Sequence, residues 1–180
     1  MNKLLILILL FLVFSCKTPE ARRPITVKSG SFIDASVERN IQLHAKEKAS
    51  IEAIMEAKEH DYITSENGFW YYYNNKIENH SLITPTFGDI INYNYNIKSL
   101  NGTIIYSIEE LKTQTYAMDK EELFAGLREG LKLMKPGETV TFLFPSQKAY
   151  GYYGDDYKIG RNVPLICEVT VNSITQNKTH

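Results

Sequence analysis

The chain has 180 residues, with 20 lysines and arginines against 21 aspartates and glutamates, so its formal net charge is −1. This length suits about one domain with appendages, since a domain takes roughly 150 residues. The near-neutral charge lacks the basic excess with which proteins bind phosphate backbones, and this argues against nucleic acid as a partner. Hydrophobic residues make up 43% of the chain and include 12 tyrosines and 8 phenylalanines, enough to build a core.

The first residues resemble a bacterial lipoprotein signal. Lys3 precedes an unbroken apolar run, Leu4 to Phe14, which is too short to span a bilayer. Ser15 and Cys16 follow in the order of a lipoprotein processing site. We therefore predict a signal peptide over residues 1–15 and lipid on Cys16. The protein would then lie in the cell envelope, anchored to a bacterial membrane and facing the periplasm. An uncleaved apolar anchor is the alternative.

Two segments of different composition follow the cysteine. Residues 16–34 carry proline and glycine without hydrophobic periodicity, which indicates a tether between the lipid and the folded part. Residues 35–60 contain neither proline nor glycine and are rich in helix formers, which predicts a long N-terminal helix. Lys48 and Glu52 interrupt its apolar stripe, so we favour a solvated spacer helix over one that forms a dimer.

Short β-rich runs and turns dominate residues 61–176. In the clearest run, residues 90–97, isoleucine and tyrosine alternate with three asparagines, which predicts one buried and one solvated face. Asn101-Gly102 is a hairpin signal after this run. The other predicted strands are 69–73, 103–106, 140–144 and 165–171.

One short helix is predicted late in this region. Asp119 with Glu122 offers an N-cap and capping partner, and apolar residues then recur at helical spacing up to Leu131. Lys135-Pro136-Gly137 would end the helix. The sum is an α+β fold, an antiparallel sheet of about five strands with one short helix.

Four motifs occur in a fixed order along this region, and together they are specific. They are Tyr95 before the Asn101-Gly102 turn, Gly126 with Glu129-Gly130, residues 134–137, and Ala149-Tyr150-Gly151. From about Gly88 to Ile174 the chain thereby resembles the FKBP-type peptidyl-prolyl cis-trans isomerases. With its lipoprotein-like start and its Asn-Tyr-Asn-Tyr-Asn run, it is most similar to the gliding-motility-associated isomerase lipoproteins of gliding bacteria.

This resemblance implies a half-open sheet wrapped around a short helix over residues 61–176, with an apolar pocket between them. It implies two catalytic groups, the Tyr150 hydroxyl and the backbone N–H of Phe124. It implies no cofactor and no metal, and as partners the proline-containing polypeptides of the envelope. The remaining pocket residues would be Tyr95, Ile105, Tyr106, Leu123, Leu127, Ile159 and Cys167.

Several of these positions depart from the family pattern. The usual tryptophan floor is Leu127, two wall phenylalanines are Ile105 and Cys167, and the rim acid is Tyr106. We therefore expect isomerase activity that is reduced rather than absent. The alternative is a non-catalytic FKBP-like lipoprotein that acts as a chaperone or binding module.

Three further features have plainer interpretations. The 4 histidines show no metal-ligand spacing. Asp155-Asp156 is typical of a polar loop tip rather than a cation site, because no third carboxylate lies at ligand spacing. Cys167 lies on the inward side of an apolar strand, which predicts a buried, unreactive thiol.

Overall fold

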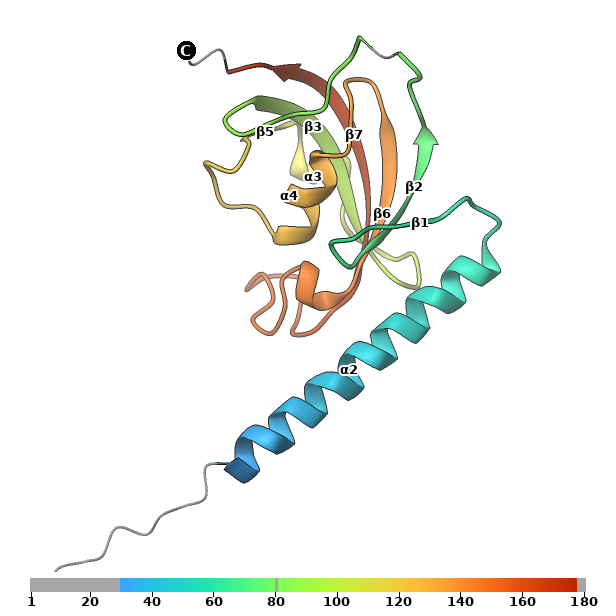
Figure 1. The fold of residues 1–180 in the computed structure, drawn as a ribbon, viewed down its shortest axis with the longest axis vertical. Coiled ribbons are helices and arrows are strands. Elements are labelled where there is room, and N and C mark those ends of the chain that lie inside the picture. Colours follow the sequence, from blue (N-terminus) through green and yellow to red (C-terminus); the bar gives the residue numbers. More distant parts are fainter. Residues whose placement is uncertain (1–29, 80, 178–180) are drawn as a thin grey trace, which may run out of the picture. The chain divides into compact units, whose positions relative to one another are not determined.

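The computed structural model describes residues 30–79 and 81–177 (Figure 1). Cys16, the signal segment 1–15 and most of the predicted tether lie outside the described residues. No helix in the described part is long and apolar enough to cross a membrane.

The N-terminal helix α2 spans Gly30–Ala57. It begins before the predicted 35–60 segment, so residues 30–34 are helical rather than part of a tether. By its internal contacts the chain divides into two units inside this helix, between Val37 and Glu38. In the second unit, most of the helix surface is exposed, but Glu47 and Ile51 are buried. The helix is therefore mostly solvated, with two buried contacts that the sequence did not predict.

The sheet has seven strands, all antiparallel, in the order β1-β2-β6-β7-β3-β4, with β5 also paired to β3. An α+β fold with an antiparallel sheet is thus confirmed, but five strands was too few. β1 and β5 were missed because two or four residues are too few to display an alternating pattern. The strands are β1 Ile63–Thr64, β2 Trp70–Asn75, β3 Ile90–Ser99, β4 Ile104–Tyr106, β5 Gln114–Ala117, β6 Thr139–Phe144 and β7 Leu165–Thr175.

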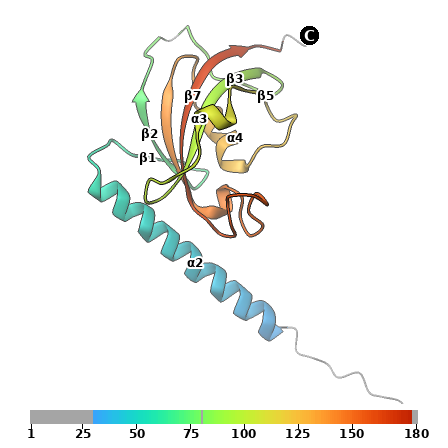
Figure 2. The same ribbon diagram turned by 180° about the vertical axis from the view of Figure 1, so that it is seen from behind.

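Three short helices join the strands. They are α3 (Ile108–Leu111), α4 (Ala125–Leu131) and the 3-10 helix η1 (Ser146–Lys148). Helix α4 lies against one face of the sheet, as both views show (Figures 1 and 2). Between them is the main core, where the side chains of Phe69, Phe142 and Phe144 have no exposed surface.

The capping box predicted at Asp119 does not form. Asp119 has a φ of 58°, and its N–H donates to the hydroxyl of Tyr116 at 3.2 Å. That hydroxyl in turn donates to the carbonyl of Glu121 at 3.3 Å. These local hydrogen bonds hold residues 119–121 in a turn, and helix α4 begins only after Phe124, without a side-chain cap.

The second face of the sheet is also partly covered. Ile51 of α2 packs on Leu143 and Ile166, which point away from the main core. The solvated face predicted for β3 is therefore wrong at Asn96, which is 7% exposed. The neighbouring Asn94 Oδ1 is buried and has no hydrogen-bond partner among the described residues.

Two glycines set the distance between α4 and the sheet. A Cβ added at Gly126 would lie 2.5 Å from the ring of Phe144 and 2.7 Å from the carbonyl oxygen of Lys148. A Cβ at Gly130 would lie 2.9 Å from the ring of Phe142. Only hydrogen at these two positions lets the helix approach the aromatic side chains of β6.

We predict that Gly126→Ala lowers the free energy of unfolding by about 1–3 kcal/mol, because the methyl group overpacks the contact with β6. The gain in helix propensity, about 1 kcal/mol, is too small to reverse this. Urea denaturation measures the difference. Gly160→Ala is the control, since its Cβ would meet nothing nearer than 3.9 Å. Equal stability of the two variants would contradict the close packing described here.

Candidate active site

All nine predicted site residues fall in one apolar cluster between α4 and the sheet. Four are buried in it: Leu127 and Cys167 with no exposed surface, Ile159 at 3% and Tyr95 at 7%. The other five are partly buried and pack against its edge: Ile105, Tyr106, Leu123, Phe124 and Tyr150. The chain segments that carry these residues are far apart in sequence, so the fold itself assembles them.

A surface hollow of about 520 Å³ opens at this edge. It is lined by Leu123, Phe124 and Tyr150 together with three charged residues, Glu121, Glu122 and Arg128. Sequence reasoning missed these charges, because the N-cap interpretation placed residues 121–122 inside a helix. Arg128 itself pairs with Asp119 and with Glu129, at 3.7 and 3.4 Å. The hollow therefore combines an apolar wall with a charged margin.

Tyr150 stands between the hollow and the buried cluster. It lies two residues after the end of η1, and its ring lies 5.1 Å from that of Phe124, centre to centre. Its hydroxyl has no hydrogen-bond partner among the described residues. Burial, followed by the nearby Tyr95 and Cys167, raises the pKa of Tyr150. The phenol is therefore neutral over the physiological pH range and can donate a hydrogen bond to a substrate carbonyl.

Phe124 lines the same hollow. It precedes the first turn of α4 in an extended conformation, with ψ of 142°, while its carbonyl accepts the N–H of Arg128 at 3.1 Å. The first N–H groups of a helix have no partner inside it. The Phe124 ring meanwhile packs edge-on against Phe144, with 5.6 Å between ring centres. The ring thus anchors the start of α4, and the N–H is left as a second donor.

The buried floor of the cluster is apolar and uncharged. Burial, followed by Cys167 and Tyr106, raises the pKa of Tyr95 to about 12. Burial also raises the pKa of the Cys167 thiol. Cys167 is free and fully buried, as predicted. No charge therefore develops in this floor near neutral pH.

Tyr106, the residue that we predicted to replace a rim acid, contacts a carboxylate from elsewhere in the chain. Its hydroxyl donates to Oδ2 of Asp155. Oδ1 of Asp155 accepts the N–H groups of Tyr157 and Ile159, at 2.9 and 2.8 Å. Asp155 lies in the loop between η1 and β7, and its carboxylate ties that loop to Tyr106, a contact that the sequence did not predict.

This network also shifts the protonation of both partners. Burial and the hydrogen bond to Asp155 raise the pKa of Tyr106 to about 12. Burial raises the pKa of the Asp155 carboxyl, but the hydrogen bonds from Tyr106, Ile159 and Tyr157 outweigh it, and the net shift is downward. Asp155 is thus ionised and Tyr106 is neutral across the physiological range.

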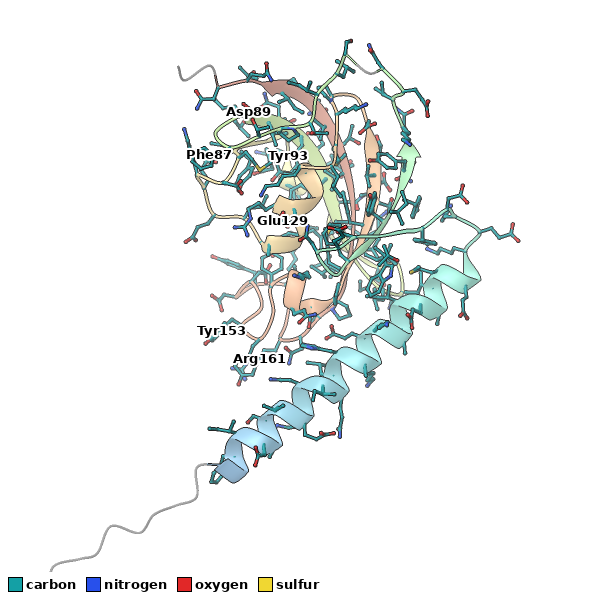
Figure 3. The ribbon with its side chains drawn as sticks, viewed as in Figure 1. Phe87, Asp89, Tyr93, Glu129, Tyr153 and Arg161 are labelled. Atoms are coloured by element: carbon teal, nitrogen blue, oxygen red, sulfur yellow. The ribbon has the colours of Figure 1, made fainter. Side chains whose placement is uncertain are left out.

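A lysine adds a second link between the same segments. Lys158 lies 4.7 Å from the centre of the Tyr106 ring and pairs with Glu110 of α3. Lys158 lies in the middle of the loop that joins η1 to β7, so its two contacts attach this loop to β4 and to α3. Its outer residues Tyr153 and Arg161 project away from the strands (Figure 3). Tyr93, by contrast, is buried in the cluster on the side of α4.

We predict that Asp155→Asn lowers the free energy of unfolding at pH 7 by about 1–2 kcal/mol, because hydrogen bonds to a charged acceptor are weakened. The pKa of Asp155 is lowered by folding, so its contribution is present above the ordinary value of about 3.9 and is lost as the pH falls below it. The difference between parent and variant should therefore shrink below about pH 4.

Denaturation curves at several pH values measure this difference. Asp156→Asn is the matched control, because Asp156 is the exposed neighbour and its side chain accepts none of the hydrogen bonds of this network. A loss of stability for Asp155→Asn that is the same at pH 3 and pH 7 would contradict the role of the ionised carboxylate.

The described residues include no cluster of three or more histidine, cysteine, aspartate or glutamate side chains that could hold a metal ion. The groups that the site does offer are two hydrogen-bond donors, the Tyr150 hydroxyl and the Phe124 N–H, beside an apolar floor. Such a site can bind and orient an uncharged carbonyl group.

Comparison with known proteins identifies the class to which this fold and site belong. A family model described as FKBP-type peptidyl-prolyl cis-trans isomerase matches residues 83–172, half of the chain. The chain belongs to this family.

Two curated relatives and two solved structures show how far the similarity extends. The peptidyl-prolyl cis-trans isomerase Mip of Coxiella burnetii is 33% identical over 91 residues, 51% of this chain and 39% of the relative. The probable FKBP-type isomerase FkpA of Neisseria meningitidis is 31% identical over 90 residues, 50% of this chain and 33% of the relative. The chain thus matches well under half the length of each.

The solved structures support the fold alone, because their sequences are distant. A peptidyl-prolyl cis-trans isomerase from Pseudomonas syringae superposes with a TM-score of 0.61 at 19% identity, covering 75% of this chain and 95% of that one. FkpA from Escherichia coli superposes with a TM-score of 0.60 at 19% identity, covering 97% of this chain and 82% of that one.

Proposed function

We propose that the chain catalyses cis-trans isomerisation of X-Pro bonds in polypeptides of the cell envelope. The observation that carries the proposal is the neutral Tyr150 hydroxyl, which has no partner among the described residues and stands at the mouth of an apolar cluster. The Phe124 N–H lies at the same edge. Membership of the isomerase family supports the same reaction.

The chemistry needs no nucleophile and no metal. An X-Pro bond has two isomers of similar energy, separated by a barrier of about 18–20 kcal/mol because rotation breaks amide resonance. An apolar site favours the twisted amide, since the planar amide has the larger dipole and is better stabilised by water. Hydrogen bonds from Tyr150 and Phe124 to a substrate carbonyl would hold the peptide while the bond turns.

The replaced floor residue supports the alternative function. Leu127 has no exposed surface and is not among the residues that line the hollow, so it presents no flat floor to a proline ring as a tryptophan would. A module that only binds proline-containing segments, or acts as a chaperone, would use the same hollow without turning the bond. Measurement of turnover separates these two functions.

We predict that Tyr150→Phe lowers kcat/KM for a Leu-Pro peptide by about 2-fold to 12-fold, because a neutral hydrogen bond contributes about 0.5–1.5 kcal/mol. A protease-free isomerisation assay on the full-length protein measures this. Tyr153→Phe is the control, since Tyr153 lies on the same loop but is 82% exposed.

One outcome would count against the site, and another against the isomerase. Turnover that is the same in Tyr150→Phe and in the parent would mean that Tyr150 is not part of the site. A parent that binds the peptide without measurable turnover would favour the binding module.

The proposed location in the envelope rests on the lipoprotein-like start of the sequence, Lys3, the apolar run and Ser15-Cys16. The same start together with the Asn-Tyr-Asn-Tyr-Asn run is the basis for proposing gliding motility as its biological setting. There the protein would be held by lipid on a bacterial membrane, facing the periplasm, and would meet envelope polypeptides as they fold.

We predict that Cys16→Ser releases the protein from the membrane fraction or blocks its maturation, because stable anchoring depends on acyl chains attached to that thiol. Fractionation of cells with detection of the protein in each fraction measures this. Normal processing with undiminished membrane binding of the variant would show that lipid on Cys16 is not the anchor.

A further inference from the structure

Glu47 is a buried acid on a helix whose other side chains are mostly exposed. It is 5% exposed, and both of its carboxylate oxygens are occupied by one residue of the isomerase domain. Oε2 accepts the backbone N–H of Ser146 at 2.9 Å, and Oε1 accepts its hydroxyl at 2.7 Å. A buried carboxylate is costly unless it is hydrogen-bonded, so this pairing is specific rather than incidental.

Ser146 holds the turn that carries Tyr150. Its carbonyl accepts the N–H of Ala149 at 3.0 Å and the N–H of Gly151 at 2.9 Å, the two amides on either side of Tyr150. The N–H and hydroxyl of Ser146 are bound by Glu47, while its carbonyl fixes the turn. Displacement of Ser146 would therefore displace the backbone from which the Tyr150 side chain projects.

The helix that carries Glu47 has a second attachment nearby. Ile51, one turn further along, has no exposed surface and packs on Leu143 of β6 and Ile166 of β7. Two other acids of α2 make contacts within the helix: Glu38 accepts a hydrogen bond from Gln42, and Glu52 pairs with Lys48. Burial of Ile51 fixes where the helix lies, and Glu47 adds the directional contact to the turn.

We propose that Glu47 is a positioning residue for Tyr150, so that attachment of helix α2 sets the placement of the proposed catalytic hydroxyl. The inference rests on the proposed function, in which Tyr150 donates to the substrate. An apolar residue at position 47 could bury the same surface. The two carboxylate oxygens of Glu47 accept the N–H and the hydroxyl of Ser146 at the same time, which an apolar side chain cannot do.

The first test is a double-mutant cycle in the full-length protein, because such cycles separate coupled from independent effects. Glu47→Ala should lower kcat/KM about threefold to tenfold, mainly in kcat, since the contact acts through the orientation of Tyr150. In a Tyr150→Phe background the same change should cost less than about twofold. Glu52→Ala, on the same helix, should leave turnover unchanged.

If the Glu47→Ala protein does not fold, the same test can be made with the more conservative variant Glu47→Gln. Glu47→Gln retains one good acceptor and should give an intermediate loss, as should Ser146→Ala, which keeps the backbone N–H contact. Losses for Glu47→Ala or Glu47→Gln that are equally large in the Tyr150→Phe background would overturn the inference, because the effect would then not pass through Tyr150.

Amide hydrogen exchange tests the positioning role of Glu47 without any measurement of turnover. A failure of the positioning role can therefore be told apart from a failure of the proposed isomerase function. Glu47→Ala, or Glu47→Gln if the former unfolds, should speed exchange at Ala149 and Gly151 while leaving Tyr95 and Val169 in β3 and β7 unchanged. Unchanged exchange at Ala149 and Gly151 would overturn the positioning role, whether or not the parent protein is an isomerase.

Discussion

The close contact between α4 and the aromatic residues of β6 is the constraint on which the rest of the domain depends. Gly126 and Gly130 remove the side chains that would hold the helix away from Phe144 and Phe142. This approach seals one side of the core. It also brings the start of α4 next to the turn that carries Tyr150, because Gly126 lies against the carbonyl of Lys148. The two proposed hydrogen-bond donors are neighbours for this reason.

Patterns within short segments predicted much of this architecture. The alternation in residues 90–97 and 165–171 located β3 and β7, and the spaced motifs around Gly126 and Tyr150 indicated the family and the residues of the apolar cluster. Local patterns failed where side-chain contacts overrode them. The hydroxyl of Tyr116 holds Asp119 in a turn, and Ile51 of α2 covers the face of the sheet on which Asn96 lies.

Two important contacts could not be predicted from the sequence at all. Tyr106 and Asp155 are separated by 49 residues, and Glu47 and Ser146 by 99. Neither pair has a local signature, because an isolated acid in a helix or loop is most often a solvated charge. The family pattern pointed to a lost acid at Tyr106, yet only the fold places the carboxylate of Asp155 against its hydroxyl. The acid that the family pattern led us to expect at position 106 is therefore absent there, but the carboxylate of Asp155 lies beside the Tyr106 hydroxyl instead.

The ties on the loop between η1 and β7 bear on how a substrate would meet the site. Asp155 binds two of the loop's own N–H groups and the Tyr106 hydroxyl, and Lys158 adds its contacts with the Tyr106 ring and Glu110. A loop held at several points before binding loses little conformational entropy when a ligand arrives. A peptide that binds here would meet a loop that is already ordered. Most of the conformational entropy lost on binding would then be lost by the peptide rather than by the protein. Selection among peptides would then depend on how readily each adopts a bound shape, which favours segments that proline has already stiffened.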